Sequence, residues 1–239
     1  MTEINKQTMQ FLFGDRELII MVADLLSAPV DVIVNPANGG LSHGGGVAGK
    51  IAYQGGDIIQ KESDLFIKEH GMLESGMVAI TSAGHFPYDA IIHAVGPKMG
   101  EGHEQKKIEL AVSRSLQLCD MHDWKSIAFP AISSGIFGVP VEITARAFFR
   151  AITSYWDARM DIPPEKIIIC LTEKSFQPFF NAFQDESKIT NHLHNDDTTH
   201  SKPVSIKQIS DADLPVGIVE LSEDDISKLE DDEIGDWFK

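Results

Sequence analysis

Two glycine-rich segments of the sequence carry residue types that bind anions. The first holds Asn38, His43 and the run Gly44 to Gly46, and the second is Ser133 to Gly138. Glycine has no side chain, so the backbone can approach a phosphate closely. A helix that begins at such a loop adds the unpaired N–H groups of its first turn. We expect each segment to bind a phosphate group through backbone amides.

Asn38 and His43 add side chains that could contact a sugar or assist its chemistry. An amide offers both a donor and an acceptor, which suits a sugar diol, and an imidazole can donate or accept near neutral pH. The simpler interpretations are that Asn38 tolerates a left-handed turn and that His43 is a solvated loop residue. Residue types alone leave both interpretations open.

Each glycine-rich segment lies between an expected strand and an expected helix. The apolar run Val32 to Val34 predicts a buried strand that ends at Pro36, a polar turn follows from Asn35 to Asn38, and Val47 to Ala52 begins a helix. The second segment follows a predicted strand over 126–132 and precedes a predicted helix over 141–156. Two such loops at one edge of a sheet would hold a diphosphate from its two sides.

The remaining pattern predicts an α/β protein. His93 lies inside one apolar strand, which favours a packed structural histidine over a catalytic one. We expect further strands at 8–13, 17–22, 77–81, 90–95 and 166–171, with helices at 51–59, 61–69 (broken at Gly55 and Gly56), 105–119 and 175–184.

Charge and length narrow the class of protein. The 239 residues allow one sizeable domain or two small ones, and the formal net charge is −16. Fourteen acidic and five basic residues from position 186 onward contribute −9, which leaves −7 for the first 185 residues. This net negative charge argues against a surface that binds nucleic acid through its overall charge. A site for an anionic ligand must therefore bind it through backbone amides.

The two cysteines bear on cross-links and metal sites, and the absence of long apolar runs indicates an intracellular protein. Cys119 and Cys170 lie in apolar settings, so we expect buried free thiols and neither a disulfide framework nor a zinc cluster. The sequence shows neither a membrane-spanning apolar run nor an apolar signal-peptide centre. We expect a cytoplasmic location without membrane contact, although a specialised secretion route would leave no mark in the sequence.

The composition changes at Asp185, which predicts a domain over 1–185 and a polar linker with an acidic, flexible tail over 186–239. His192, His194 and His200 in the linker indicate incidental polarity more than a metal site. In the tail, Ile226, Leu229 and Trp237 could share one face of an acidic helix. A disordered tail is the default, and a motif for a protein partner built on Trp237 and Phe238 is the sharper alternative.

The segment NPANGGLSHGGGVAGKIA, residues 35–52, resembles the signature loop of the macrodomain family, whose members bind ADP-ribose. It is most similar to the coronavirus-type macrodomains and to those of large ADP-ribosyltransferases. AFPAISSGIFGVP, residues 128–140, is similar to the second phosphate loop of the family, and the resemblance covers roughly residues 8–185. It implies a three-layer α/β/α fold with a central mixed sheet, ADP-ribose or an ADP-ribosylated protein as the partner, no cofactor and no metal.

The resemblance also implies roles for individual residues. Asp24, otherwise a helix cap, would accept from the exocyclic amine of adenine, and Phe137, otherwise a core-capping aromatic, would pack near the distal ribose. Leu171 would replace the usual aromatic shelf under adenine. The implied ligand contacts are Asp24, Leu25, Asn38, Gly44, Gly45, Gly46, Val47, Ser133, Ser134, Gly135, Ile136, Phe137 and Leu171.

The resemblance leaves the activity open between catalysis and binding. Asn38 and His43 match residues that the family's hydrolases use, although Ala48 stands where one hydrolase branch has an aspartate, and Pro36 removes a backbone donor. The coronavirus-type branch shares the alanine and includes hydrolases. The leading hypothesis is hydrolysis of mono-ADP-ribose from acidic side chains of proteins. The alternatives are a non-catalytic reader and a deacetylase or phosphatase of small ADP-ribose derivatives.

Overall fold

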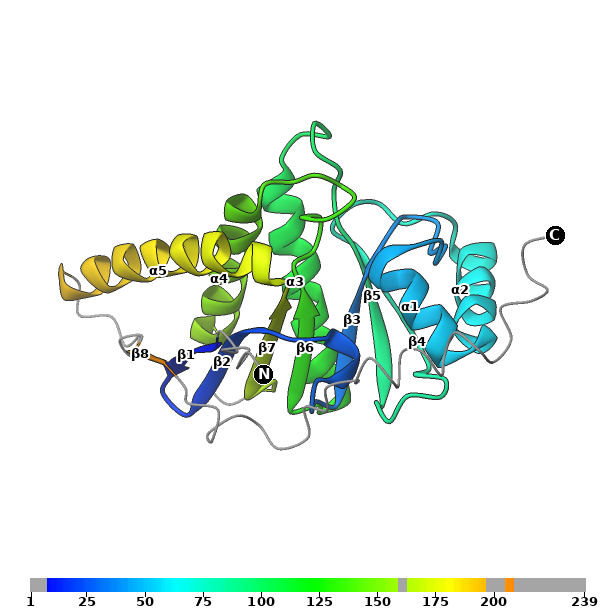
Figure 1. The fold of residues 1–239 in the computed structure, drawn as a ribbon, viewed down its shortest axis with the longest axis horizontal. Helices are drawn as coiled ribbons and strands as arrows, with labels where there is room; N and C mark the ends of the chain where they lie inside the picture. The colour runs from blue at the N-terminus through cyan, green and yellow to red at the C-terminus, as the bar shows by residue number, and fades with distance from the viewer. Residues whose placement is uncertain (1–7, 159–162, 197–204, 209–239) are drawn as a thin grey trace, which may run out of the picture.

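The computed structural model describes residues 8–158, 163–196 and 205–208. They form one eight-stranded sheet with helices on both faces (Figure 1). The strands are β1 (Thr8–Phe13), β2 (Arg16–Val22), β3 (Val32–Ala37), β4 (Val78–Thr81), β5 (Ala90–Val95), β6 (Ser126–Pro130), β7 (Lys166–Leu171) and β8 (Ser205–Gln208). The helices are η1 (Leu25–Ser27), α1 (Gly46–Gly55), α2 (Asp57–His70), α3 (Glu104–His122), α4 (Val141–Ala158) and α5 (Glu173–Asp196).

The sheet is mixed, as predicted, and its order is β4-β5-β3-β6-β7-β2-β1-β8. The five strands from β5 to β2 in this order run parallel, whereas β4, β1 and β8 pair antiparallel at the two sides. Because parallel strands carry their C-terminal ends to one edge of a sheet, the loops after β2, β7, β6, β3 and β5 share that edge.

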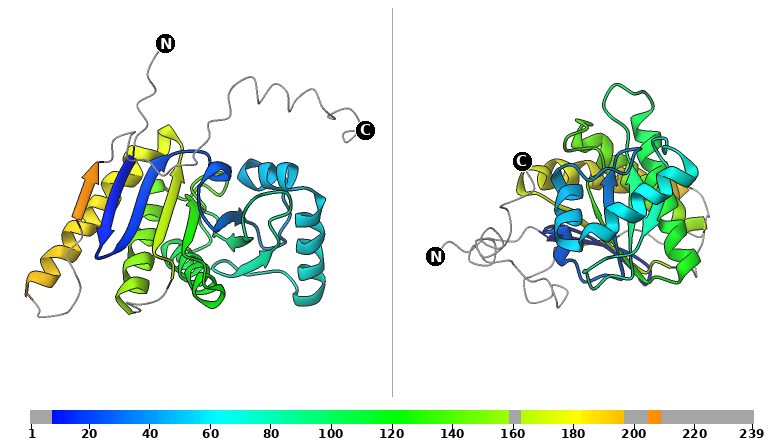
Figure 2. Two further views of the ribbon diagram at one scale, coloured as in Figure 1. Left: turned by 90° about the horizontal axis from the view of Figure 1, so that it is seen from below. Right: turned by 90° about the vertical axis from the view of Figure 1, so that its right-hand side faces the viewer.

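Successive residues of the central strands pack into two different cores. In β2, Leu18 and Ile20 contact the core under α3, α4 and α5, while Ile19 and Met21 contact the core under η1, α1 and α2. Figure 1 shows α3, α4 and α5 gathered on one side, and Figure 2 shows α1 and α2 at the end of the molecule away from β8. The predicted three-layer α/β/α arrangement is confirmed.

The strand before the first glycine-rich loop is longer than predicted. β3 does not stop at Pro36 but continues to Ala37, so Asn35 lies in the strand and is buried. Pairing with β6 ends at Ile33, whereas pairing with β5 continues to Ala37. A proline, which has no N–H to donate, is tolerated where one side of the strand is unpaired.

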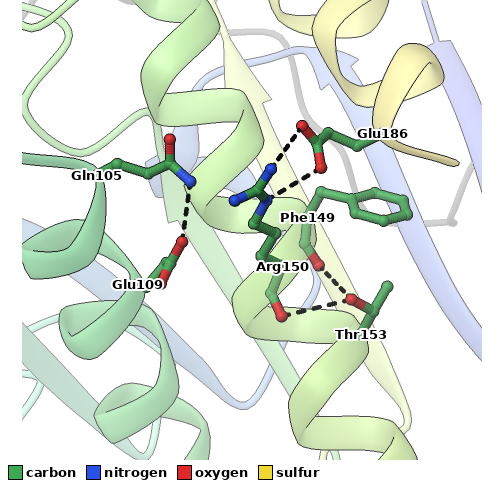
Figure 3. Close-up of polar contacts among 6 residues, drawn as sticks. All are labelled: Gln105, Glu109, Phe149, Arg150, Thr153 and Glu186. Carbon is green, nitrogen blue, oxygen red and sulfur yellow. Dashed lines mark hydrogen bonds and ion pairs between the residues drawn. The ribbon is translucent and has the colours of Figure 1, made fainter. Parts of the chain in front are cut away.

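The last helix is also longer than predicted. The expected helix ends at Gln184, and a linker was expected from residue 186, but α5 continues to Asp196. Glu186 is buried and accepts from Arg150 of α4, with Nε to Oε2 at 3.0 Å and Nη2 to Oε1 at 3.2 Å (Figure 3). Phe183 packs against Phe149, with ring centroids 4.8 Å apart. These contacts with α4 hold the helix beyond the point where composition changes.

Part of the predicted tail lies in the sheet, because β8 pairs with β1 from Ser205 to Gln208. His192 and His194 fall within α5. His200 and the residues of the proposed tail motif, Ile226, Leu229, Trp237 and Phe238, lie outside the described residues.

Cys119 and Cys170 are buried free thiols, as predicted. Burial raises the pKa of Cys119 and raises that of Cys170 to about 12, so neither forms a thiolate near neutral pH. No helix in the described part of the chain is long and apolar enough to cross a bilayer.

Candidate ligand-binding site

The predicted site residues follow strands that are neighbours in the sheet. Asp24 follows β2, Leu171 ends β7, Ser133 follows β6 and Asn38 follows β3, and the sheet order is β2-β7-β6-β3. Adjacent strands are spaced by about 4.8 Å, so the strands that carry Asp24 and Asn38 are about 14 Å apart. The sheet therefore lays these residues out in a line that suits an extended ligand.

At the β2 end of this line, Asp24 caps η1. Its Oδ1 accepts from the backbone N–H of Leu26 at 3.1 Å, so the expected capping role is confirmed. The carboxylate is exposed, and Oδ2 can accept from a ligand. Leu25 is buried, and its carbonyl accepts from the Tyr88 hydroxyl at 3.5 Å.

Leu171 does not form the apolar shelf that the resemblance implies. Its side chain is 4% exposed and belongs to the core under α3, α4 and α5. The strand continues to this residue, and the pleat directs its side chain into that core instead of toward the edge. An adenine ring would therefore meet little of the Leu171 surface.

Asn38 closes the turn at the start of the first loop. Its Nδ2 donates to the Ser42 carbonyl at 2.7 Å, and its Oδ1 accepts from the N–H groups of Gly40 and Ser42 at 3.0 and 3.3 Å. A second Nδ2 contact, to Ser42 Oγ, is long at 3.4 Å. The left-handed residue of this turn is Leu41, with φ 50°, and not Asn38.

The glycine run presents bare backbone at the start of α1. A Cβ built on Gly44 or Gly45 would meet no atom within 4 Å. Gly46 has φ 60°, a left-handed conformation that favours glycine, and it begins α1, whose N-cap Gly45 provides no capping side chain. The N–H groups of this first turn can therefore bind an anion. Val47 follows in the same turn and is half-buried.

The second loop is held by its own backbone. Ser133 has φ 68°, is buried, and has a hydroxyl without a protein partner. Ser134 donates from N and Oγ to the Ala131 carbonyl at 3.2 and 2.8 Å, and the Gly138 N–H donates to the Gly135 carbonyl at 3.0 Å. These bonds fold the loop tightly.

The tip of the second loop faces the first loop. Ile136 is 85% exposed, and its Cδ1 would lie 3.5 Å from a Cβ on Gly46. The Phe137 carbonyl accepts from the Met99 N–H at 2.8 Å, and the Lys98 ammonium lies 5.6 Å from the centre of the half-buried Phe137 ring. The structure thus brings the two loops together and adds a cation that sequence reasoning missed.

Both ring nitrogens of the half-buried His43 lie close to protein side chains. Its Nδ1 lies 2.7 Å from Gln60 Oε1, which also accepts from the His43 backbone N–H at 3.1 Å. Its Nε2 lies 3.3 Å from Nδ1 of His93. These contacts show that His43 holds the loop, and its expected contact with a sugar stays a prediction.

His93 is a packed structural histidine, as predicted. It is fully buried, with Nε2 2.8 Å from Thr81 Oγ1 and Nδ1 3.0 Å from Asn35 Nδ2. Burial, followed by the proximity of His43, lowers the pKa of His93 to about 3. His93 is therefore neutral at physiological pH.

Two further residues shape the site without belonging to either predicted loop. Gln60 of α2 binds the first loop, and Gly96 after β5 makes room for the second. A Cβ on Gly96 would lie 2.6 Å from Ile132 Cγ2 and closer still to Ser133 Oγ. The isolated glycine at a strand end is the signal that could have identified Gly96. Across 8–158 and 163–188, no group of three or more His, Cys, Asp or Glu residues could hold a metal ion.

Comparison with known proteins identifies a matching family. The macro domain family matches residues 34–148, which include both loops. A macro domain-containing protein of Caldanaerobacter subterraneus is 33% identical over 71% of this chain and 97% of its own length. The human protein mono-ADP-ribosyltransferase PARP14 is 35% identical over 72% of this chain and 10% of its own.

A solved structure shares the fold. A glycine-to-valine mutant of the Oceanobacillus iheyensis macrodomain, crystallised with ADPR, is 28% identical, with a TM-score of 0.68 over 77% of this chain and 98% of the other. The fold shared with the Oceanobacillus structure, the family match over both loops and the identity over almost the full length of the Caldanaerobacter relative all indicate the same family. This chain belongs to the macro domain family.

Proposed function

We propose that the edge formed by the ends of β2, β7, β6 and β3 binds ADP-ribose. The observation that carries this proposal is the pair of loops after β3 and β6, which approach one another at Gly46 and Ile136 and carry exposed glycine backbone at Gly44, Gly45 and Gly135. Backbone N–H groups in loops of this kind suit a diphosphate. The Oceanobacillus macrodomain crystallised with ADPR supports the same ligand.

We propose a place for each part of the ligand along the line of residues at the sheet edge. Adenine lies at the β2 end, where the exposed Asp24 carboxylate accepts from the exocyclic amine. The diphosphate lies between the two loops, and the distal ribose lies toward Asn38 and Phe137. Neutral backbone amides bind the phosphates, because the first 185 residues have a net charge of −7.

Calorimetric titration of the purified chain tests this proposal. ADP-ribose should give saturable heat, AMP should bind more weakly because it lacks the second phosphate and the distal ribose, and UDP-glucose should bind more weakly because it lacks adenine. An absence of heat with ADP-ribose at millimolar concentration would reject the proposal.

A second candidate function is hydrolysis of mono-ADP-ribose from acidic side chains of proteins. The observation that favours it is the second Nδ2 hydrogen of Asn38, whose contact with Ser42 Oγ is long at 3.4 Å. A ribose hydroxyl can accept a hydrogen bond from this N–H, and that contact would orient the anomeric carbon toward an attacking water. His43 would contribute by holding the loop, and the ligand's diphosphate would be the base nearest the water.

Release of label from an auto-modified mono-ADP-ribosyltransferase distinguishes the two functions. The hydrolase proposal expects release by the wild type and its loss in Asn38→Ala. Saturable binding without release would leave a reader of ADP-ribosylated proteins. The same preparation, incubated with acetyl and phosphate esters of ADP-ribose, tests action on small derivatives.

A further inference from the structure

We infer that Gln60 is the positioning residue of the binding site, because it holds the first loop on α2 and sets which nitrogen of His43 carries the proton. Gln60 is the fourth residue of α2 and belongs to neither glycine-rich segment. The inference rests on the proposed function for its effect on affinity, but its structural part can be tested without a ligand.

The orientation of the Gln60 amide is determined by its backbone partners. Oε1 lies 3.1 Å from the His43 N–H, which can only donate, and Nε2 lies 3.3 Å from the Leu41 carbonyl, which can only accept. Nε2 also donates to the Asp64 carboxylate at 2.7 Å. Exchange of the amide oxygen and nitrogen would turn all three contacts into repulsions, so a single orientation is allowed.

This orientation determines the tautomer of His43. Its Nδ1 lies 2.7 Å from the oxygen of Gln60, which is an acceptor, and must therefore carry the proton. In the neutral ring, Nε2 then holds a lone pair, which faces Nδ1 of His93 at 3.3 Å. His93 must then donate from that nitrogen, and its own Nε2 lies 2.8 Å from Oγ1 of Thr81, a hydroxyl that also lies 3.0 Å from the Ser82 carbonyl.

Asn35 lies beside the same pair of histidines. Asn35 Oδ1 is buried without a hydrogen bond when Nδ2 is placed 3.0 Å from His93 Nδ1. If the Asn35 amide is turned over, Oδ1 shares the proton on His93 Nδ1 with His43 Nε2, and Nδ2 becomes the amide atom without a partner. The low pKa of His93 agrees with a neutral ring. A directional chain therefore runs from His93 through His43 to Gln60.

Gln60 matters for binding because it contacts the backbone immediately before the glycine run. Its bonds to Leu41 and His43 bracket Ser42, and Gly44 follows. A Cβ on Gly44 or Gly45 would meet no atom within 4 Å, so no side chain packs over these two glycines. Without Gln60, the loop would have to become ordered when the phosphate binds, and this entropy cost would weaken affinity.

Two variants and a matched control test the inference. Gln60→Leu removes every contact of the amide, whereas Gln60→Glu keeps an acceptor for the His43 N–H and Nδ1–H. The control is Gln105→Leu, because Gln105 is a half-buried helical residue that donates to a carboxylate four positions on, Glu109, at 3.0 Å (Figure 3). Two-bond ¹H–¹⁵N spectra of the ligand-free protein report the tautomer of His43, and calorimetry reports ADP-ribose affinity.

We expect Gln60→Leu to lose the Nδ1–H signature of His43 and to bind ADP-ribose about 10- to 100-fold more weakly, from the loss of two hydrogen bonds to the loop backbone. Gln60→Glu should keep the signature and recover part of the affinity, and Gln105→Leu should match the wild type in both. Wild-type affinity and an unchanged His43 spectrum in Gln60→Leu would overturn the inference, whatever happens to thermal stability. An Nε2–H tautomer of His43 in the wild type would overturn it too, even if no ADP-ribose bound, whereas absence of binding alone would count only against the proposed function.

Discussion

Gly96→Ala should disturb the second loop from behind. A Cβ at this position would lie 2.6 Å from Cγ2 of the fully buried Ile132 and would overlap Ser133 Oγ. Ser133 is itself buried with φ 68° and cannot move without the loop. Overpacking of this kind costs about 1–3 kcal/mol. For a domain of this size that corresponds to a fall in Tm of about 2–12 °C.

The displaced loop should also bind the diphosphate less well. We expect ADP-ribose affinity to fall about tenfold, which corresponds to roughly 1.4 kcal/mol. Differential scanning calorimetry and isothermal titration measure the two effects. Gly44→Ala is the control for stability, because its Cβ would meet no atom within 4 Å and the Tm should stay near that of the wild type. If Gly96→Ala kept both the wild-type Tm and the wild-type affinity, the argument that this glycine makes room for Ser133 would be wrong.

Three further predictions follow from buried or exposed charges. Because the pKa of His93 falls from 6.5 to about 3 on folding, the unfolded chain binds the extra proton between these values. The free energy of unfolding should therefore fall by up to about 1.4 kcal/mol per pH unit below pH 6.5. Urea titrations at pH 7, 6 and 5 measure this free energy, which should depend less steeply on pH in His93→Gln than in the wild type. Arg150→Met removes two hydrogen bonds to Glu186 and should speed amide hydrogen exchange near the middle of α5. Lys188→Met removes an exposed ion pair and should leave the exchange rates unchanged. Equal exchange rates in the two variants would show that the Arg150–Glu186 contact does not hold α5. Asp24→Asn keeps a capping side chain for η1 and should keep the wild-type Tm. It should lower the affinity for ADP-ribose about tenfold and leave the affinity for ribose 5-phosphate unchanged. Equal losses of affinity for the two ligands in calorimetry would contradict the proposed contact of Asp24 with adenine.

Local patterns were sufficient to predict seven of the eight described strands, both glycine-rich loops, the two buried thiols and the structural role of His93. Each depends on residues close together in sequence. An apolar run such as Ile167 to Ile169 favours a strand that is buried on both faces, wherever the strand lies in the sheet. Consecutive glycines at a helix start expose backbone N–H groups for the same local reason.

Contacts between distant segments decided what the sequence left open. Asn35 lies in a strand because β5 pairs with β3 through Ala37, and α5 continues past Gln184 alongside the Arg150 contact of α4 with Glu186. His43 binds inward because Gln60 and His93, 17 and 50 residues away, converge on its ring. Hydrophobic periodicity carries no information about such pairings, whose energy appears only when the chain is packed. The amino-acid sequence by itself therefore indicated the two loops as candidates for binding a phosphate, and only the tertiary structure decided where the loops contact each other and which side chains hold them.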